Sequence, residues 1–150
     1  MLRDDINNAL KEAMKAKDER KISTLRLVNS TFKNADIEAR TTGKPLSDSD
    51  LLPVLQKMIK QRQESKDLYE KGGRPELAQQ EADEIAIISA YLPKQMSEAE
   101  MSIAIEGAIA ETGAASMKDM GKVVGALKAK YAGQMDFAKA SAMVKGKLGG

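Results

Sequence analysis

The stretch that decides the fold is SDSDLLPVLQKMIKQRQESKDLYEKGGRP, residues 47–75. Residues 47–50 are good helix-capping residues, and the apolar residues over 51–69 recur every three or four positions, as one face of a helix requires. Pro53 falls in the first turn, where its missing N–H costs no hydrogen bond. The breaker Gly-Gly-Arg-Pro at 72–75 then ends this helix and can start another. The stretch predicts a helical hairpin.

The two helices of this hairpin carry opposite charge bias outside their apolar stripes. The first is rich in Lys and Arg around Arg62, and the second carries several carboxylates, among them Glu81 and Glu84. Antiparallel helices with such flanks can form ion pairs along their contact. Glu81 and Glu84 could also be imagined as a metal-binding pair, but ion pairs between the flanks explain them better, and a solvated face explains most of the other charges.

The helical periodicity extends to both sides of the hairpin. Two apolar stripes precede it, so four helices are expected within residues 1–92. Residues 93–96 then interrupt the pattern as a hinge, and three shorter helices follow within 97–148. Because β-branched and aromatic runs at strand spacing are absent, we predict an all-α protein. A helical N-terminal subdomain is expected over 1–95 and a smaller one over 96–150.

The composition excludes several kinds of catalyst. The 150 residues include no Cys and no His, which removes thiol nucleophiles, imidazole acid–base chemistry and Cys/His zinc sites. A glycine loop for nucleotide phosphates is missing as well. We therefore see no self-sufficient catalytic site, and we expect no metal and no cofactor.

The N-terminal sequence and the hydropathy bear on location. Asp4 and Asp5 stand where a signal or transit peptide would lack acidic residues. No apolar stretch approaches the ~20 residues of a membrane span. A cysteine-free chain fits a reducing compartment. These features predict a cytoplasmic protein that does not bind membranes.

Positive charge is concentrated toward the C-terminal end of the sequence. Residues 113–150 hold seven lysines against Asp119 and Asp136, although the formal net charge of the whole chain is only +2. Such asymmetry is a hint of an anionic partner. A solvated lysine-rich surface explains the same distribution, and charge alone favours that simpler explanation.

The segment from Ser116 to Tyr131 has the clearest chemical argument. The spacing of Ser116 and Asp119 is that of a capping box and predicts that a helix begins there. Projected on a helix, its large apolar side chains gather on one side. The opposite side is small and positive: it comprises Lys118, Lys122, Gly125 and Ala129, and Gly121 and Lys128 flank it. Each interior glycine costs about 1 kcal/mol relative to alanine, so two of them suggest the close approach of another backbone. That backbone could belong to a neighbouring helix, which spacing alone favours, or to phosphates.

If an RNA approaches this face, the composition indicates which kind. Backbone amides at the helix start near Ser116 would add donors for an anion. Proteins that read single strands stack bases on exposed aromatic rings. This chain has three Tyr, two Phe and no Trp, and these rings mostly fall in apolar stripes. A folded RNA recognised through its backbone therefore fits better than an extended strand.

Motifs that lie in order along the chain resemble the YqeY-like family. They are AMKAKD at 13–18 with LRLV at 25–28, KQRQES at 60–65, YLPKQM at 91–96 and DMGKVVGAL at 119–127. The resemblance implies a C-terminal subdomain related to the tail domain of the GatB subunit of tRNA-dependent amidotransferases, a domain that helps to engage folded tRNA. It thereby implies tRNA contact by the residues that match the last motif, together with the lysine before it. These residues are Lys118, Gly121, Lys122 and Gly125.

This chain departs from the family pattern at two positions. Gln134 stands where the family often has arginine, which weakens any role of that loop in gripping phosphate. Val124 stands where methionine is frequent, a conservative apolar change. The family is also associated with carbon–nitrogen ligase activity that uses glutamine as amido donor, but this chain supplies neither the nucleophile nor an ATP site for that chemistry.

The interpretation that follows is an accessory protein that binds structured tRNA through its basic C-terminal subdomain and is associated with tRNA-dependent amidation. Its expected partners are tRNA and subunits of an amidotransferase or an aminoacyl-tRNA synthetase. Two alternatives stay open: a component with ligase activity only within a larger enzyme, and a helical protein–protein adaptor that binds no RNA. Salt dependence separates RNA binding from an apolar helix interface.

Overall fold

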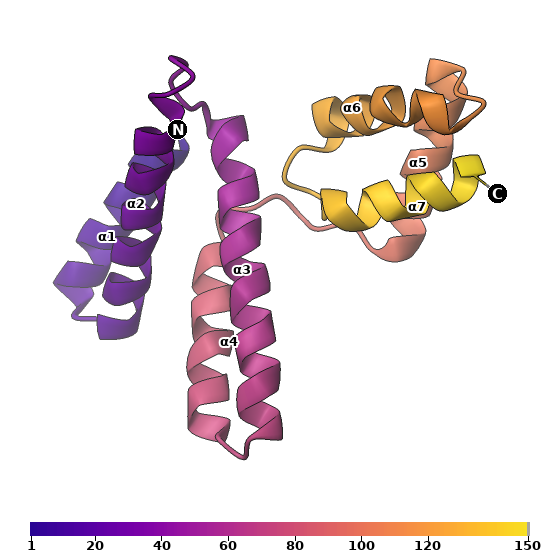
Figure 1. The fold of residues 1–150 in the computed structure, drawn as a ribbon. Helices are drawn as coiled ribbons and strands as arrows, with labels where there is room; N and C mark the ends of the chain where they lie inside the picture. The colour runs from indigo at the N-terminus through magenta and orange to yellow at the C-terminus, as the bar shows by residue number, and fades with distance from the viewer. Residues whose placement is uncertain (150) are drawn as a thin grey trace. The chain divides into compact units, whose positions relative to one another are not determined.

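The computed structural model describes residues 1–149, which form seven α-helices and one 3₁₀ turn in two compact units (Figure 1). The N-terminal unit, Met1–Pro93, comprises α1 (Leu2–Ala16), α2 (Glu19–Ala39), α3 (Asp48–Lys71) and α4 (Pro75–Ser89). The C-terminal unit begins at Lys94 and comprises α5 (Glu98–Thr112), the 3₁₀ turn η1 (Met117–Asp119), α6 (Met120–Tyr131) and α7 (Phe137–Gly149). The all-α prediction is confirmed, and the sequence pattern places the boundary between the units two residues later than the structure does.

The hairpin of α3 and α4 forms where the sequence predicts it. At its start the Asp50 carboxylate accepts hydrogen bonds from the backbone N–H and the hydroxyl of Ser47, both at 2.9 Å. These bonds hold the pKa of Asp50 below its ordinary value. At the turn Gly73 adopts a φ of +70°, a left-handed conformation that suits glycine, and Pro75 begins α4.

An ion pair joins the two helices of the hairpin. Arg62 of α3 and Glu84 of α4 have side chains only 11% and 15% exposed, and Arg62 Nε lies 3.2 Å from Glu84 Oε2. A second guanidinium nitrogen of Arg62 donates to the Met58 carbonyl at 3.0 Å, whereas the Nε–H is not aligned for a hydrogen bond. The pKa of Glu81 is raised by burial and by the nearby charge of Glu84. The predicted pairing of opposite flanks is confirmed here.

The core of the N-terminal unit draws on all four of its helices. Its largest fully buried side chains include Ile6, Leu25, Phe32, Leu55 and Ile88. Tyr91 and Leu92, just beyond α4, also pack against this core. The unit therefore holds the chain as far as Leu92.

The C-terminal unit has its own core, to which each of its α-helices contributes. Buried residues from α5, α6 and α7 surround Met135, which lies in the loop before α7 and is 1% exposed. Ser97 caps α5 in a capping box. The backbone N–H of Ser97 donates to the Glu100 carboxylate at 3.1 Å, and the backbone N–H of Glu100 donates to the Ser97 hydroxyl at 3.2 Å. At the other end of α5, Gly113 adopts a φ of +67°.

The connector between the units is short. The Gln95 side-chain amide donates to the Gly133 carbonyl at 2.6 Å, and the Met96 N–H donates to the Gln134 carbonyl at 2.7 Å. The C-terminal unit thus holds the chain from Gln95 onward, only three residues after Leu92, which packs against the core of the N-terminal unit. Within residues 1–149, no helix is both long enough and apolar enough to cross a lipid bilayer.

Candidate nucleic-acid interface

The start of α6 differs from the sequence prediction. The predicted helix begins at Ser116, but residues 117–119 form the 3₁₀ turn η1 and the α-helix begins at Met120. The Ser116 side chain makes no capping bond; instead the Asp119 carboxylate accepts a hydrogen bond from the Ala115 N–H at 3.0 Å. Lys118 therefore lies in the turn before α6.

This geometry changes the electrostatics at the helix start. The hydrogen bond from the Ala115 amide, aided by the Ser116 amide and by Lys122, holds the pKa of Asp119 below its usual value. The Asp119 carboxylate therefore already accepts a hydrogen bond from the Ala115 amide, one of the amides next to the start of the helix. Its negative charge opposes an anion at this point, so the lysine side chains carry the anion-binding argument.

The predicted site residues all reach the surface of the C-terminal unit. Lys118 is exposed in η1, and the other four are exposed on α6: Gly121, Lys122, Gly125 and Lys128. The opposite side of α6 is buried in the core through Val123 and Leu127. Helical periodicity therefore separates the small, positive face of α6 from its apolar face.

The two glycines of this face have open space above them. A β-carbon built on Gly121 or Gly125 meets no atom within 4 Å, and the same holds for Gly107 in α5 and Gly146 in α7. Packing of a helix of this unit against Gly121 and Gly125, which spacing alone favoured, is therefore not the reason for them. Their cost to helix stability is not offset by any close contact among the described residues.

Replacing both glycines by alanine, Gly121→Ala with Gly125→Ala, should stabilise the C-terminal unit by about 1–2 kcal/mol in total, because alanine restricts the unfolded chain and meets no clash. Chemical denaturation followed by circular dichroism measures the change. Gly113→Ala is the matched control and should destabilise, since φ is +67° there. A loss of stability in the double variant would show that a contact requires these glycines.

Ion pairs neutralise part of the C-terminal lysine excess. Three of the seven lysines pair with glutamates of α5: Lys130 with Glu111 at 4.0 Å, Lys147 with Glu106 at 3.0 Å, and Lys139 with Glu98. In the part of the chain that the structure describes, no carboxylate lies within 4 Å of the other four lysines, which are Lys118, Lys122, Lys128 and Lys145. The positive charge available to a partner is therefore smaller and more localised than the sequence indicated.

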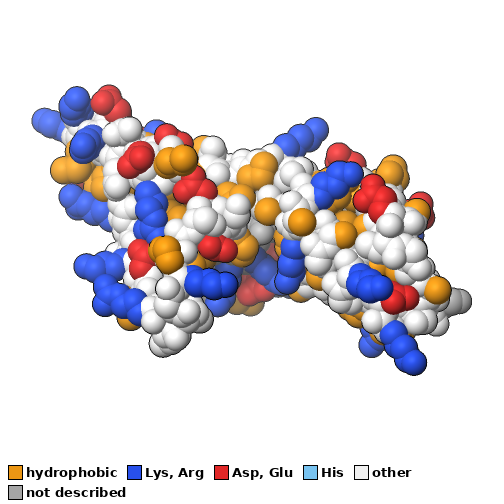
Figure 2. Space-filling model, turned by 90° about the horizontal axis from the view of Figure 1, so that it is seen from above, with side chains coloured by type: hydrophobic (Ala, Val, Ile, Leu, Met, Phe, Trp, Pro, Cys, Tyr) orange, Lys and Arg blue, Asp and Glu red, His pale blue; other side chains and the backbone are white. Residues whose placement is uncertain are grey.

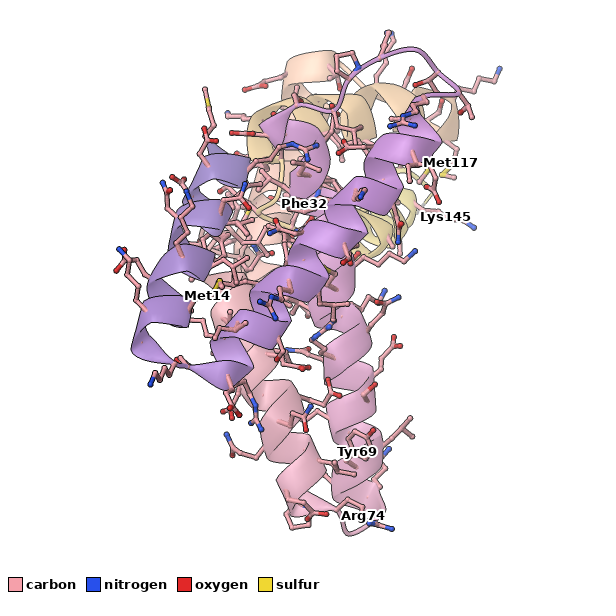
Figure 3. The ribbon with its side chains drawn as sticks, turned by 90° about the vertical axis from the view of Figure 1, so that its left-hand side faces the viewer. Met14, Phe32, Tyr69, Arg74, Met117 and Lys145 are labelled. Atoms are coloured by element: carbon pink, nitrogen blue, oxygen red, sulfur yellow. The ribbon has the colours of Figure 1, made fainter. Side chains whose placement is uncertain are left out.

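Lys145 is the residue that sequence reasoning missed. It lies on α7, four residues before Gly149, where a β-carbon would be 3.5 Å from the sulfur of Met117 in η1. Figure 3 shows Met117 and Lys145 at the same end of the unit. Because residues four apart share one helix face, Lys145 joins the end of the unit that carries Lys118. Only the packing of α7 on η1 reveals this, and the sequence carries no signal for it.

The loop before α7 is structural. Met135 is buried, and the Gln134 carbonyl accepts the hydrogen bond from Met96.

None of the five aromatic side chains, which all lie within residues 1–149, is exposed: Phe32 is buried and the others are partly buried. The described residues therefore offer no exposed ring for stacking a base, and no group of three or more acidic side chains among them could hold a metal ion.

Comparisons with known proteins give a family and several relatives. Residues 3–148 match the family described as Yqey-like protein. The protein named Altered inheritance of mitochondria protein 41, mitochondrial, from Eremothecium gossypii is 42% identical over 83 residues, 55% of this chain and 44% of that protein. Its namesake from Lachancea thermotolerans is 35% identical over 109 residues, 71% and 57% of the two chains. In these alignments the chain spans about half the length of the curated relatives.

The names of these relatives correct the predicted location. They are called mitochondrial proteins, which contradicts the expectation of a cytoplasmic protein. One ground for that expectation was the absence of cysteine, which fits any reducing compartment and does not distinguish one from another.

Proposed function

This chain belongs to the YqeY-like family, and on that basis we propose that it is an accessory protein that binds structured tRNA through its C-terminal unit in support of tRNA-dependent amidation. Its protein partners in this role are subunits of an amidotransferase or an aminoacyl-tRNA synthetase. The ligase chemistry itself belongs to those partners, since the chain has no Cys or His.

The observation that supports this proposal most is the surface of η1 and α6. Lys118, Lys122 and Lys128 are exposed and lie within 4 Å of no described carboxylate, although Lys122 interacts electrostatically with Asp119, and they stand beside two glycines above which nothing packs. An RNA backbone can approach the helix closely there while the lysines neutralise its phosphates. The lack of exposed aromatic rings among residues 1–149 favours a folded RNA over a single strand.

A salt series tests the proposal. The protein is titrated with whole tRNA, duplex DNA and unstructured RNA between about 0.05 and 0.2 M salt, a range over which phosphate contacts weaken steeply. We expect preference for tRNA. In the variant Lys118→Ala with Lys122→Ala, the slope of log affinity against log salt should decrease in magnitude by about 2, one for each lost phosphate contact.

The control removes the same charge from elsewhere in the unit. Lys139→Ala with Lys147→Ala deletes two lysines that pair with glutamates of α5. This variant should bind tRNA with a nearly unchanged slope. Equal binding to all three nucleic acids, or equal slopes in both variants, would overturn the proposed site.

A groove in the C-terminal unit favours the protein–protein adaptor as the second candidate. The groove has a volume of about 420 Å³ and lies between α5 and α6, with Gly107, Ala104 and Leu127 among its lining residues. Ile103 at its edge is 71% exposed. An apolar helix of a partner could bury this surface, and such an interface would respond weakly to salt.

A further inference from the structure

One face of α2 in the N-terminal unit carries a row of exposed cations. Arg26 and Lys33 lie on α2 and Arg40 caps its C-terminal end; they are spaced seven residues apart, so they follow one side of the helix over about 21 Å. Lys44 follows in the loop after α2 and is exposed as well. None of these four side chains lies within 4 Å of a carboxylate among residues 1–149, and the exposed Ser30 stands between the first two.

Other arginines of the same unit are neutralised. Arg3 pairs with Asp36 at 2.6 Å and Arg20 pairs with Asp83 at 2.6 Å. Asp36 lies between Lys33 and Arg40 in the sequence, but its carboxylate is already paired with Arg3. Glu38 is exposed but lies about 120° around the helix from Arg26. The cations on this face thus have little competition from acids between Arg26 and Arg40, although the sequence of the N-terminal part is close to neutral as a whole.

The row ends in a hollow at each end of the helix. Arg26 and Lys17 line a hollow of about 650 Å³ at the turn between α1 and α2, together with Glu19. Arg40 and Lys44 line another, of about 510 Å³. Cations outnumber carboxylates in the lining of both. Figure 2 shows one face of the molecule, on which blue Lys and Arg side chains are interspersed with red Asp and Glu side chains. Each hollow gives an anion access to at least two cations.

We propose that this face of α2 is a second surface that contacts the phosphate backbone of a folded RNA. The inference rests on the proposed tRNA binding and extends it to the N-terminal unit. Arginine and lysine neutralise phosphates, and side chains such as the Ser30 hydroxyl and the Asn34 amide donate hydrogen bonds to phosphate or ribose oxygens. A row about 21 Å long spans several phosphates of one strand.

A folded RNA suits this face better than an anionic membrane. The exposed large apolar residues of α2, Leu27 at 44% and Ile37 at 48%, are ten residues apart, with polar residues such as Ser30 and Asn34 between them. A helix that inserts into a lipid interface needs a continuous apolar stripe on its lipid-facing side, and the apolar stripe of α2 is buried in the core of its own unit.

The test removes the row in the full chain. In the variant Arg26→Ala, Lys33→Ala, Arg40→Ala, we expect tRNA affinity to fall at least about tenfold and the salt slope to decrease in magnitude by about 3. The matched control, Lys57→Ala, Lys71→Ala, Arg74→Ala, removes the same charge from exposed positions on the hairpin of α3 and α4. It should bind with nearly the wild-type affinity. Denaturation curves confirm that both variants are folded.

Four outcomes bear on the two proposals separately. If the α2 variant and its control bind tRNA alike while Lys118→Ala with Lys122→Ala weakens binding, the α2 surface is overturned and the proposed function stands. If only the α2 variant weakens binding, the α2 surface stands and the C-terminal site fails. If the wild type does not bind tRNA, both fail. Loss of binding by the α2 variant to phosphatidylserine vesicles, with tRNA binding intact, would also overturn the RNA assignment.

Discussion

Replacing Arg62 by alanine should destabilise the N-terminal unit by about 3 kcal/mol, one of the two largest effects expected for this protein. The change leaves the Glu84 carboxylate, 15% exposed, without its cation. It also removes the hydrogen bond to the Met58 carbonyl and the packing of a long side chain that continues the apolar stripe of α3. Urea denaturation monitored by circular dichroism measures the loss.

A double variant tests whether the missing cation causes this loss. Arg62→Met with Glu84→Leu replaces both charges by apolar side chains of similar reach, and such replacements of buried ion pairs are often neutral or stabilising. We expect the double variant to be at least about 2 kcal/mol more stable than Arg62→Ala. If the two variants are equally unstable, packing around the pair matters more than its charges. A loss below about 1 kcal/mol for Arg62→Ala would show that Glu84 is solvated well enough without Arg62.

Met135→Ala should cost the C-terminal unit about 3 kcal/mol, since the side chain is 1% exposed and lies among buried residues of α5, α6 and α7. Its removal leaves a cavity that the helices cannot easily close. A unit this small buries a modest core, so a loss of this size removes most of its stability. We therefore expect the C-terminal unit to unfold first, while the N-terminal helices keep their circular dichroism signal.

The control for this variant is another methionine of the same unit. Met117 is 40% exposed, and Met117→Ala should cost less than about 1 kcal/mol. Native-state hydrogen exchange assigns the loss to a unit, because amides of α5, α6 and α7 should lose protection in Met135→Ala and those of α3 should not. Uniform loss of protection through both units would contradict their independent cores.

The elements that the sequence predicted best are those whose signals are local. Ser47, Pro53 and the Gly-Gly-Arg-Pro breaker at 72–75 each act within a turn or two, and the structure follows them. The start of α6 was misplaced because Ser116 and Asp119 have the spacing of a capping box. The Asp119 carboxylate bonds instead to the Ala115 amide, in a 3₁₀ turn that the same spacing permits.

The candidate site was predicted only as far as helical periodicity reaches. The exposed face with Lys122 and Gly125 follows from the buried positions of α6, which the sequence shows. The ion pairs of Lys130, Lys139 and Lys147 could not be predicted, because each depends on α5 lying beside α6 and α7. The row on α2 was missed for a different reason. In the sequence its cations are balanced by nearby acidic residues, and only the structure shows that acids such as Asp36 are already paired with other cations, here Arg3.

The short connection between the two units has a consequence for affinity. Leu92 is held by one unit and Gln95 by the other, so their Cα atoms can separate by no more than about 10 Å. A long polyanion bound by one unit would therefore meet the other at a millimolar effective concentration. Two weak surfaces joined by so short a linker can bind about 10²- to 10⁴-fold more tightly than either alone. Lengthening the connector would lower that avidity while leaving every contact in place.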